Sequence, residues 1–347
     1  MRLALLAATI AAGLLGASPA WTQNISGAGS TFAFPVLQSW SQAYQREQSD
    51  AEFQPVGSGL DYEPIGSQAG MMRLRAGDVD FGTTDVPLGP EELKASALTQ
   101  FPIVMGGVVA AVNLPGLKSG QLKLTGPLLA DIYLGRIKTW SDPAIRDLNL
   151  ELSLPDAAIA VIRRQDGSGT TFNFTDYLSK VSPEWQARIG RALAVDWPVG
   201  TGAKGNGGMA DAIKATPNSI GYVEFAQAQR SGLSSALLKN RAGNFVAPSQ
   251  QSFQAAARDA DWSSAREFNL LLTDSASAEA YPIVATTFAV VSAKKPASQR
   301  VRMAIAFFRW SAASGAKRAT DLGYVPLPSQ LVEQVEANWR TLLGAPN

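Results

Sequence analysis

Residues 159–162, Ile-Ala-Val-Ile, lead directly into Arg-Arg-Gln-Asp-Gly-Ser-Gly-Thr at residues 163–170. The first segment is apolar and rich in β-branched residues, which is typical of a buried strand. Phe174, Leu178 and Val181 follow the second segment at helical spacing. The N–H groups of a first helical turn have no partner within the helix and carry partial positive charge, so a loop of small residues before them can seat an anion. This stretch therefore predicts a strand, an anion-binding loop and a helix.

A loop of small residues precedes a helix twice more, nearer the N-terminus. Gly-Ala-Gly-Ser-Thr-Phe at 27–32 precedes apolar residues at helical spacing, and Ile-Gly-Ser-Gln-Ala-Gly at 65–70 leads into a short helix and another strand. This repeated order predicts an α/β fold with mainly parallel sheets flanked by helices, and with ligands at the carboxyl ends of strands. Buried strands are also predicted at 105–113 and 281–291. Such a pair suits a hinge where the chain enters a second lobe and later returns.

Length and composition bound the class of protein. The 347 residues exceed one average domain, and 46% hydrophobic residues allow two cores. A formal net charge of +1 provides no global field that would attract nucleic acid or anionic lipid. The sequence contains no cysteine and no histidine, which excludes disulfides, cysteine nucleophiles, zinc clusters and histidine-based acid–base relays. We expect no nucleic-acid partner, no metal and no cofactor.

The first twenty residues have the pattern of an export signal. Arg2 supplies a small positive region, residues 3–15 are apolar except for Thr9, and Ser-Pro-Ala at 18–20 fits a cleavage site. The alternative is a membrane anchor, but the apolar run is shorter than the ~20 residues that span a bilayer. We expect residues 1–20 to be a signal peptide and the mature protein to lie in the bacterial periplasm.

Arg164 and Asp166 form a charged pair in the loop after residue 162. A guanidinium that follows a buried strand can reach inward and offer parallel donors to a tetrahedral oxyanion, and a nearby carboxylate can orient it. A surface ion pair is the alternative for these two residues, since exposed Arg–Asp pairs are common and weak. Ser168, Gly169 and Thr170 favour a binding site because their hydroxyl and N–H groups add neutral donors.

Asp85 ends the segment Phe-Gly-Thr-Thr-Asp, at the carboxyl end of a predicted strand. A carboxylate at this position commonly caps the next helix, and that alternative stays open. In a binding site, an ionised carboxylate accepts hydrogen bonds and repels an anion that carries no proton. Hydrogen phosphate carries a proton and sulfate does not, so Asp85 facing the anion would predict discrimination between the two.

Residues 200–208 form a glycine-rich segment that contains one lysine. The segment lacks the Gly-Lys-Ser/Thr ending of a nucleotide-binding P-loop. We expect a tight turn that opens a helix.

Seven segments together resemble the PstS family, the periplasmic phosphate-binding subunits of bacterial phosphate ABC transporters. The similarity covers nearly all of the chain after residue 20, and 163–170 is its most specific piece. The segments are 27–32, 62–85, 105–116, 131–140, 161–170, 204–206 and 220–225.

The resemblance implies a two-lobed periplasmic binding protein fold of type II, which closes on one phosphate in a cleft between the lobes. Residues 21–110 and 283–347 would form lobe I, and residues 111–282 would form lobe II, after a signal peptide at residues 1–20.

The resemblance also implies which residues bind the ligand. Asp85 would accept the phosphate proton, and Arg164, supported by Asp166, would form the ion pair. Donors would come from both lobes: Thr31, the Phe32 N–H, Ser67, Ser168, Gly169 and Thr170.

Two positions depart from the family pattern. Residues 53–61 and 62–70 form a tandem pair of similar nine-residue units, so Ser58 and Ser67 compete for one serine position. Ser67 is favoured because the stretch 62–82 aligns without a gap and so keeps its spacing to Asp85. Ser30 stands where the family usually carries alanine, a departure that should matter little if its side chain faces away from the site.

The sequence therefore predicts a monomeric binding protein that captures inorganic phosphate and delivers it to a membrane-embedded ABC permease. A secreted phosphatase is one alternative, which the absence of histidine and of a two-metal acidic cluster disfavours. The other alternative is a binding protein for sulfate, molybdate or an organic phosphate, which Asp85 and enclosure of the ligand by both lobes disfavour.

Overall fold

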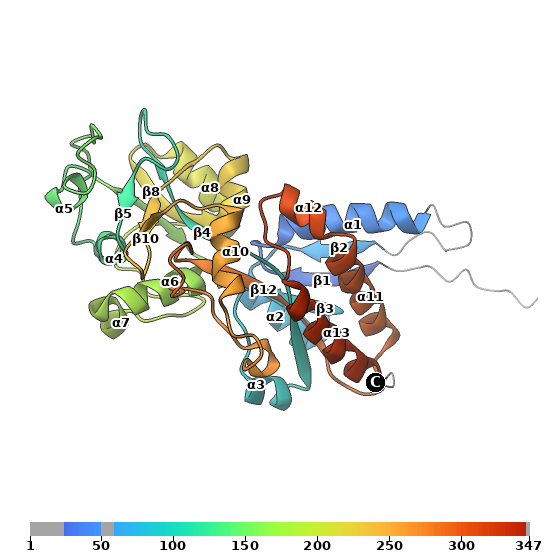
Figure 1. Ribbon diagram of the computed structural model, residues 1–347. Coiled ribbons are helices and arrows are strands. Elements are labelled where there is room, and N and C mark those ends of the chain that lie inside the picture. Colours follow the sequence, from blue (N-terminus) through green and yellow to red (C-terminus); the bar gives the residue numbers. More distant parts are fainter. Residues whose placement is uncertain (1–23, 50–58, 345–347) are drawn as a thin grey trace, which may run out of the picture.

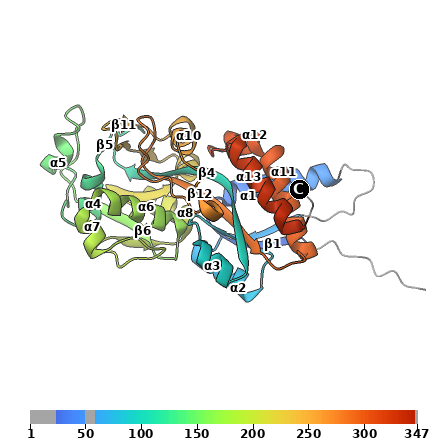
Figure 2. The same cartoon turned by 60° about the horizontal axis from the view of Figure 1, so that its bottom comes forward.

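The described part of the chain forms two α/β bodies side by side, with strands β4 (Leu98–Asn113) and β12 (Val284–Ser292) running between them (Figures 1 and 2). This computed structural model describes residues 24–49 and 59–344. The predicted signal peptide at 1–20 and Ser58 lie outside the described residues. Among the helices of the described ranges, none is both long and apolar enough to cross a membrane.

The first body combines the N-terminal strands and helices with the helices from the C-terminal end. Phe308 and Trp339 from two of those helices pack edge-on against Phe101 of β4, with ring centroids 5.5 and 5.1 Å away. The elements of this body are β1 Ile25–Gly29, α1 Phe34–Ser49, β2 Leu60–Glu63, α2 Ser67–Ala76, β3 Phe81–Thr84, α3 Pro90–Ala95, α11 Gln299–Ala313, α12 Ala316–Asp321 and α13 Ser329–Leu343.

The second body has its own aromatic core, in which Phe174 stacks on Tyr222 with centroids 4.3 Å apart and Tyr133 lies edge-on to Phe174. Its main elements are α4 Gly126–Tyr133, α5 Pro143–Arg146, β6 Ala160–Arg164, α6 Gly169–Val181, α7 Pro183–Arg188, β7 Thr201–Ala203, α8 Gly205–Ala215, β8 Ser219–Glu224 and α9 Phe225–Arg230. The remaining elements are β5 Lys123–Leu124, β9 Ser234–Ser235, β10 Leu237–Lys239, β11 Phe245–Val246, α10 Gln250–Arg258 and the short 3-10 helix Arg266–Phe268.

A sheet that holds nine of the described strands passes through both bodies, in the order β2-β1-β3-β12-β4-β8-β6-β7, with β9 also beside β4. Strand β1 is parallel to β2 and β3, and β6 is parallel to β7 and β8. Strands β4 and β12 Val284–Ser292 run antiparallel to their neighbours. The parallel groups point their carboxyl ends toward loops that begin helices, which is the usual place for a ligand.

Strand β4 Leu98–Asn113 belongs to both bodies. Its residues 98–107 pair with β12, and its residues 108–113 pair with β8. Phe253 of α10 covers the changeover, where a Cβ on Gly107 would lie 2.2 Å from the ring. Glycine is needed at this point because the aromatic ring contacts the strand backbone.

The predicted fold class is confirmed, and residues 159–181 form the predicted strand, loop and helix as β6 and α6. Residues 200–208 differ from the prediction, because β7 precedes the predicted helix. Strand β7 pairs in parallel with the end of β6. The three residues of β7, Thr-Gly-Ala, include a glycine and are too few to show the alternating apolar pattern of a strand, so the sequence predicts only a tight turn here.

Candidate functional site

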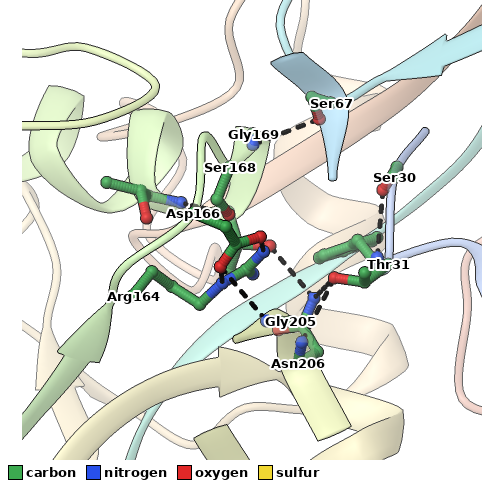
Figure 3. A network of polar contacts seen from close by, with 12 residues as sticks. Ser30, Thr31, Ser67, Arg164, Asp166, Ser168, Gly169, Gly205 and Asn206 are labelled. Carbon is green, nitrogen blue, oxygen red and sulfur yellow. Dashed lines mark hydrogen bonds and ion pairs between the residues drawn. The ribbon is translucent and has the colours of Figure 1, made fainter. Parts of the chain in front are cut away.

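Loops from both bodies meet where β1, β3 and β6 end (Figure 3). The first body contributes Ser30, Thr31, Ser67 and Asp85. The second body contributes the loop at 164–170 and the start of α8. Most of these side chains are buried, while Thr31 and Asp166 are half-buried and Gln165 is exposed, so the bodies largely enclose the place where the loops meet.

Arg164 is the last residue of β6 and is only 2% exposed. Its Nε donates to Asp166 Oδ1 at 2.7 Å, and Nη2 is paired with Asp166 Oδ2. Burial would raise the pKa of Asp166, but the hydrogen bond and charge of Arg164 lower it below its usual value. The predicted pair is therefore an inward clamp and not a surface ion pair.

The third guanidinium nitrogen of Arg164 is unpaired within the part of the chain that the structure describes. Nη1 is buried and has no hydrogen-bond acceptor among the described residues. A buried charged donor without an acceptor is costly, and native proteins rarely leave one unpaired. Its position beside the other loops indicates that an anion belongs there.

Helix α6 begins at Gly169, one residue after the predicted loop serine. Ser168 is the N-cap, and its Oγ accepts from Thr171 N at 3.2 Å. The Gly169 N–H donates to Ser67 Oγ of the first body at 3.1 Å, as Figure 3 shows. Thr170 Oγ1 accepts from the Asn206 amide at 3.1 Å. The first turn of α6 thus brings its donors to the interface of the two bodies, as the sequence predicts.

Ser67 begins α2 and is 1% exposed. Its Oγ accepts from Asp85 N at 3.3 Å as well as from Gly169 N. Gly66 precedes it with φ 94°, and a Cβ there would lie 2.8 Å from Gly167 O of the opposite body. Glycine at 66 therefore lets the loops approach, and the structure brings the favoured Ser67 to the site.

Asp85 follows β3 and is 1% exposed. Its Oδ1 accepts from Ser30 Oγ at 2.6 Å and from Thr287 Oγ1 at 2.7 Å. Burial raises the pKa of Asp85 to about 6, and the two hydroxyls and then the charge of Arg164 limit the rise. Near neutral pH the carboxyl group is therefore mostly ionised, which makes it an acceptor beside the donors of Arg164.

The first loop differs in one respect from expectation. Thr31 Oγ1 lies at the interface and accepts from Asn206 N at 3.1 Å. The Phe32 N–H donates to Ser30 Oγ at 3.0 Å. The Ser30 side chain does not face away from the site, so the condition under which its departure from the family pattern would matter little is not met. The Ser30 N–H is anchored to Thr83 at the end of β3, and this anchoring turns its side chain toward Asp85.

Asn206 is a site residue that our sequence analysis missed. Its Nδ2 donates to Thr31 Oγ1 at 3.0 Å and to Thr170, and its Oδ1 accepts from Glu224 N at 3.0 Å. One amide thus connects the two predicted ligand loops, and Figure 3 shows Asn206 in contact with Thr31. Residues 204–206 belong to the resemblance, which was the signal that could have found it.

Asn173 and Thr287 were also missed. Asn173 Nδ2 donates across the interface to Asp85 O at 2.7 Å, and Thr287 lies on β12, far from any predicted motif. Asn173 falls within a predicted helix and Thr287 within a predicted strand, but neither belongs to a predicted ligand loop, so no motif indicated a role at the site.

In this arrangement, inward-facing donors surround the ionised acceptor Asp85, and the second carboxylate, Asp166, is paired with Arg164. Arg164 supplies charge, while helix N-termini and hydroxyls supply neutral donors. An ionised carboxylate such as Asp85 only accepts hydrogen bonds, so it pairs with a group that carries a hydrogen. The chemistry fits a small, enclosed, protonated oxyanion.

Comparison with known proteins agrees with the fold and extends it. A family model described as "PBP superfamily domain" matches residues 16–314. The phosphate-binding protein PstS of Xylella fastidiosa is 47% identical over 91% of this chain and 85% of its own length. PstS of Haemophilus influenzae is 42% identical over 95% of this chain and 96% of its own.

A solved structure shares the fold at low sequence identity. It is a putative phosphate ABC transporter substrate-binding protein from Clostridium perfringens with bound phosphate. The TM-score is 0.63 at 20% identity, with 88% of this chain and all of that chain covered.

Proposed function

The chain belongs to the PstS family of phosphate-binding proteins, and we propose that it captures inorganic phosphate in the periplasm and delivers it to a membrane-embedded ABC permease. The observation that carries the proposal is that a buried cationic donor and a buried anionic acceptor lie at the same interface. The Arg164 Nη1 donor has no partner among the described residues, and the Asp85 acceptor lies at the same interface. The role is one of binding, without catalysis.

Phosphate would contact side chains and N–H groups from both bodies. Arg164 would donate through Nη1 while Asp166 keeps the guanidinium plane fixed. The full set of proposed ligand residues is Thr31, Phe32, Ser67, Asp85, Arg164, Ser168, Gly169 and Thr170.

We assign residues 21–110 and 283–347 to one lobe and 111–282 to the other, in a monomer. Bonds such as those from Gly169 N to Ser67 Oγ and from Asn173 to Asp85 O cross this division. Because ligand donors come from both lobes, phosphate stabilises the closed form over the open one. Enclosure also removes the water that would weaken each hydrogen bond.

Asp85 would reject sulfate. Against an unprotonated anion its lone pairs face other lone pairs, and a buried charged group without a hydrogen bond costs about 1–3 kcal/mol or more. Sites that require one hydrogen bond can discriminate by about 10⁴-fold against a ligand that lacks it.

The experiment is calorimetric titration of the mature protein and of Asp85→Asn with phosphate and with sulfate at pH 7.5. The asparagine amide can donate to sulfate, so we expect phosphate to bind at least tenfold more weakly and the preference for phosphate to fall by about 100-fold or more. Asp61→Asn, which changes an exposed carboxylate on β2, serves as the matched control. An unchanged preference in Asp85→Asn contradicts proton recognition, and no phosphate binding by the wild type contradicts the function.

A further inference from the structure

Two hydroxyl groups from distant parts of the chain donate to the same oxygen of Asp85. Ser30 lies in the loop after β1, and Thr287 lies on β12, 202 positions from Asp85 in the sequence. Ser30, Thr287 and the carboxyl group are all at most 1% exposed. Oδ1 therefore has two short hydrogen bonds, of 2.6 and 2.7 Å, in a region without bulk water.

The other oxygen faces the opposite body. A Cβ placed on Gly169, the first residue of α6, would lie 2.7 Å from Asp85 Oδ2. Oδ2 is thus next to the helix N-terminus where the anion is proposed to sit. The two oxygens of one carboxyl group have different surroundings: hydroxyls on one side and the ligand seat on the other.

We propose that Ser30 and Thr287 are specificity-determining residues, which saturate Oδ1 and keep Asp85 an ionised acceptor whose other oxygen, Oδ2, admits only an anion that carries a proton. This inference rests on the proposed function and deepens it. Neither residue is required to touch the ligand. Each acts on the ligand indirectly, as a residue that positions the Asp85 carboxylate.

Among the groups that face Asp85, the two hydroxyls are the ones that most stabilise its ionised form. Arg164 on β6 is the facing cation, Ser67 comes from α2, and the phenols of Tyr62 on β2 and of Tyr324 after α12 are neutral at physiological pH. Burial raises the pKa of Asp85, and the hydrogen bonds from Ser30 and then Thr287 oppose this rise more strongly than the charge of Arg164 does.

Loss of these bonds would change what the site recognises. Without the hydroxyls, the ionised carboxylate loses its main stabilising partners, so the pKa of Asp85 rises further. A protonated Asp85 would present an O–H donor from Oδ2, and that donor pairs with sulfate as well as with phosphate. The preference of the site for phosphate over sulfate should therefore vary with pH. The two hydroxyls should determine the pH below which sulfate also binds.

The experiment measures how strongly sulfate competes with phosphate between pH 5 and 8.5, in the full mature protein. Thr287→Val and Ser30→Ala should move the pH at which sulfate begins to compete upward by about one unit, and the double variant further. Thr287→Ser keeps a hydroxyl and should keep the wild-type profile. Thr286→Val is the matched control, because Thr286 is the neighbouring buried residue on β12 and its hydroxyl has no partner among the described residues.

Three results would overturn the inference. The first is a wild-type competition profile in both Ser30→Ala and Thr287→Val. The second is a uniform loss of phosphate affinity at every pH without entry of sulfate, which would mean that the hydroxyls act on packing. The third is an equal shift in Thr287→Ser and Thr287→Val. Phosphate binding by the wild type, measured in the same titrations, tests the proposed function separately.

Discussion

Glu224, like Asp85, has a buried carboxyl group, but it is not one of the proposed ligand residues. It ends β8, caps the first turn of α9 through bonds from Ala226 N and Gln227 N, and is 1% exposed. Burial raises its pKa to about 7, and the capping bonds limit the rise. A folded-state pKa above the usual value means that the folded protein holds this proton more tightly than the unfolded chain does.

Stability should therefore fall as pH rises. The contribution of Glu224 is fully present below its usual pKa of 4.5 and is lost as pH rises through about 7. Urea unfolding of the phosphate-free protein should show the free energy of unfolding decrease by about 2 kcal/mol from this group between pH 5 and 7.5. Glu224→Gln should remove that part and leave a smaller decrease from Asp85, whose pKa is raised in the same direction.

Glu91→Gln, at an exposed position of α3, is the control and should retain the full decrease. A Glu224→Gln protein whose unfolding free energy still falls as steeply as that of the wild type would contradict the assignment.

At this scale, the sequence predicts the residues that act within a contiguous motif. Arg164, Asp166 and Ser168 stand within five positions of one another, so their geometry follows from one strand and one helix N-terminus. Thr287 cannot be found in this way, because its contact with Asp85 depends on β12 pairing beside β3. The orientation of Ser30 likewise depends on its bonds to Thr83, 53 positions away.

Among the elements, helix α6 brings its N-terminus against the opposite body, and Gly169 makes that approach possible. A Cβ at this position would lie 2.6 Å from both Asp85 Cβ and Ser67 Oγ, closer than real contacts allow. These atoms belong to the first body, so the conflict exists only when the bodies are closed. Within its own helix, alanine is tolerated at least as well as glycine.

Gly169→Ala should therefore separate binding from folding. We expect phosphate affinity to fall by about 100-fold or more, since a ~2–3 kcal/mol clash opposes the closed form, while the melting temperature without phosphate is unchanged or slightly higher. Calorimetry and thermal unfolding provide the two measurements.

Gly207→Ala in α8 is the matched control, because no described atom lies within 4 Å of its added Cβ. It should bind phosphate as the wild type does. Equal affinity in the two alanine variants would show that closure does not bring α6 against Asp85.

Element types are predictable from sequence where apolar spacing is strong, as at 159–181 and 105–113. Strand β4 is longer than its prediction, beginning at Leu98. Its added residues include Thr99, Gln100 and Pro102, which interrupt an apolar pattern, and pairing with β12 nevertheless holds them in the sheet. Tertiary pairing of this kind overrides local propensity.

At the scale of the whole molecule, the two bodies are held together by polar bonds as well as by the shared sheet. Asn206 contributes most directly, since its backbone N and its amide both donate to Thr31 Oγ1. These contacts form only in the closed molecule, so they stabilise the closed form over the open form even when no ligand is bound.

Asn206→Ala should shift this balance toward the open form. The variant keeps the backbone N–H bond to Thr31 but loses the amide bond to Thr31 Oγ1. One such bond is worth about 0.5–1.5 kcal/mol, so about two to ten times more phosphate should be needed to compact the molecule. Small-angle X-ray scattering during a phosphate titration measures the compaction. Asn244→Ala, which removes an exposed amide bond to Ala278 O, should leave the midpoint in place. A wild-type midpoint for Asn206→Ala would refute the role of this amide.

Strand β4 has a further consequence for how such molecules can diversify. One continuous strand pairs with β12 before Gly107 and with β8 after it. Genetic recombination between two relatives at this point would therefore join two halves of a sheet that have not evolved to pack together. Recombinants are tolerated best where exchanged segments end in exposed loops. The two faces that enclose the anion are therefore expected to be inherited as a matched set, and new ligand preferences should arise by point substitution within one lineage.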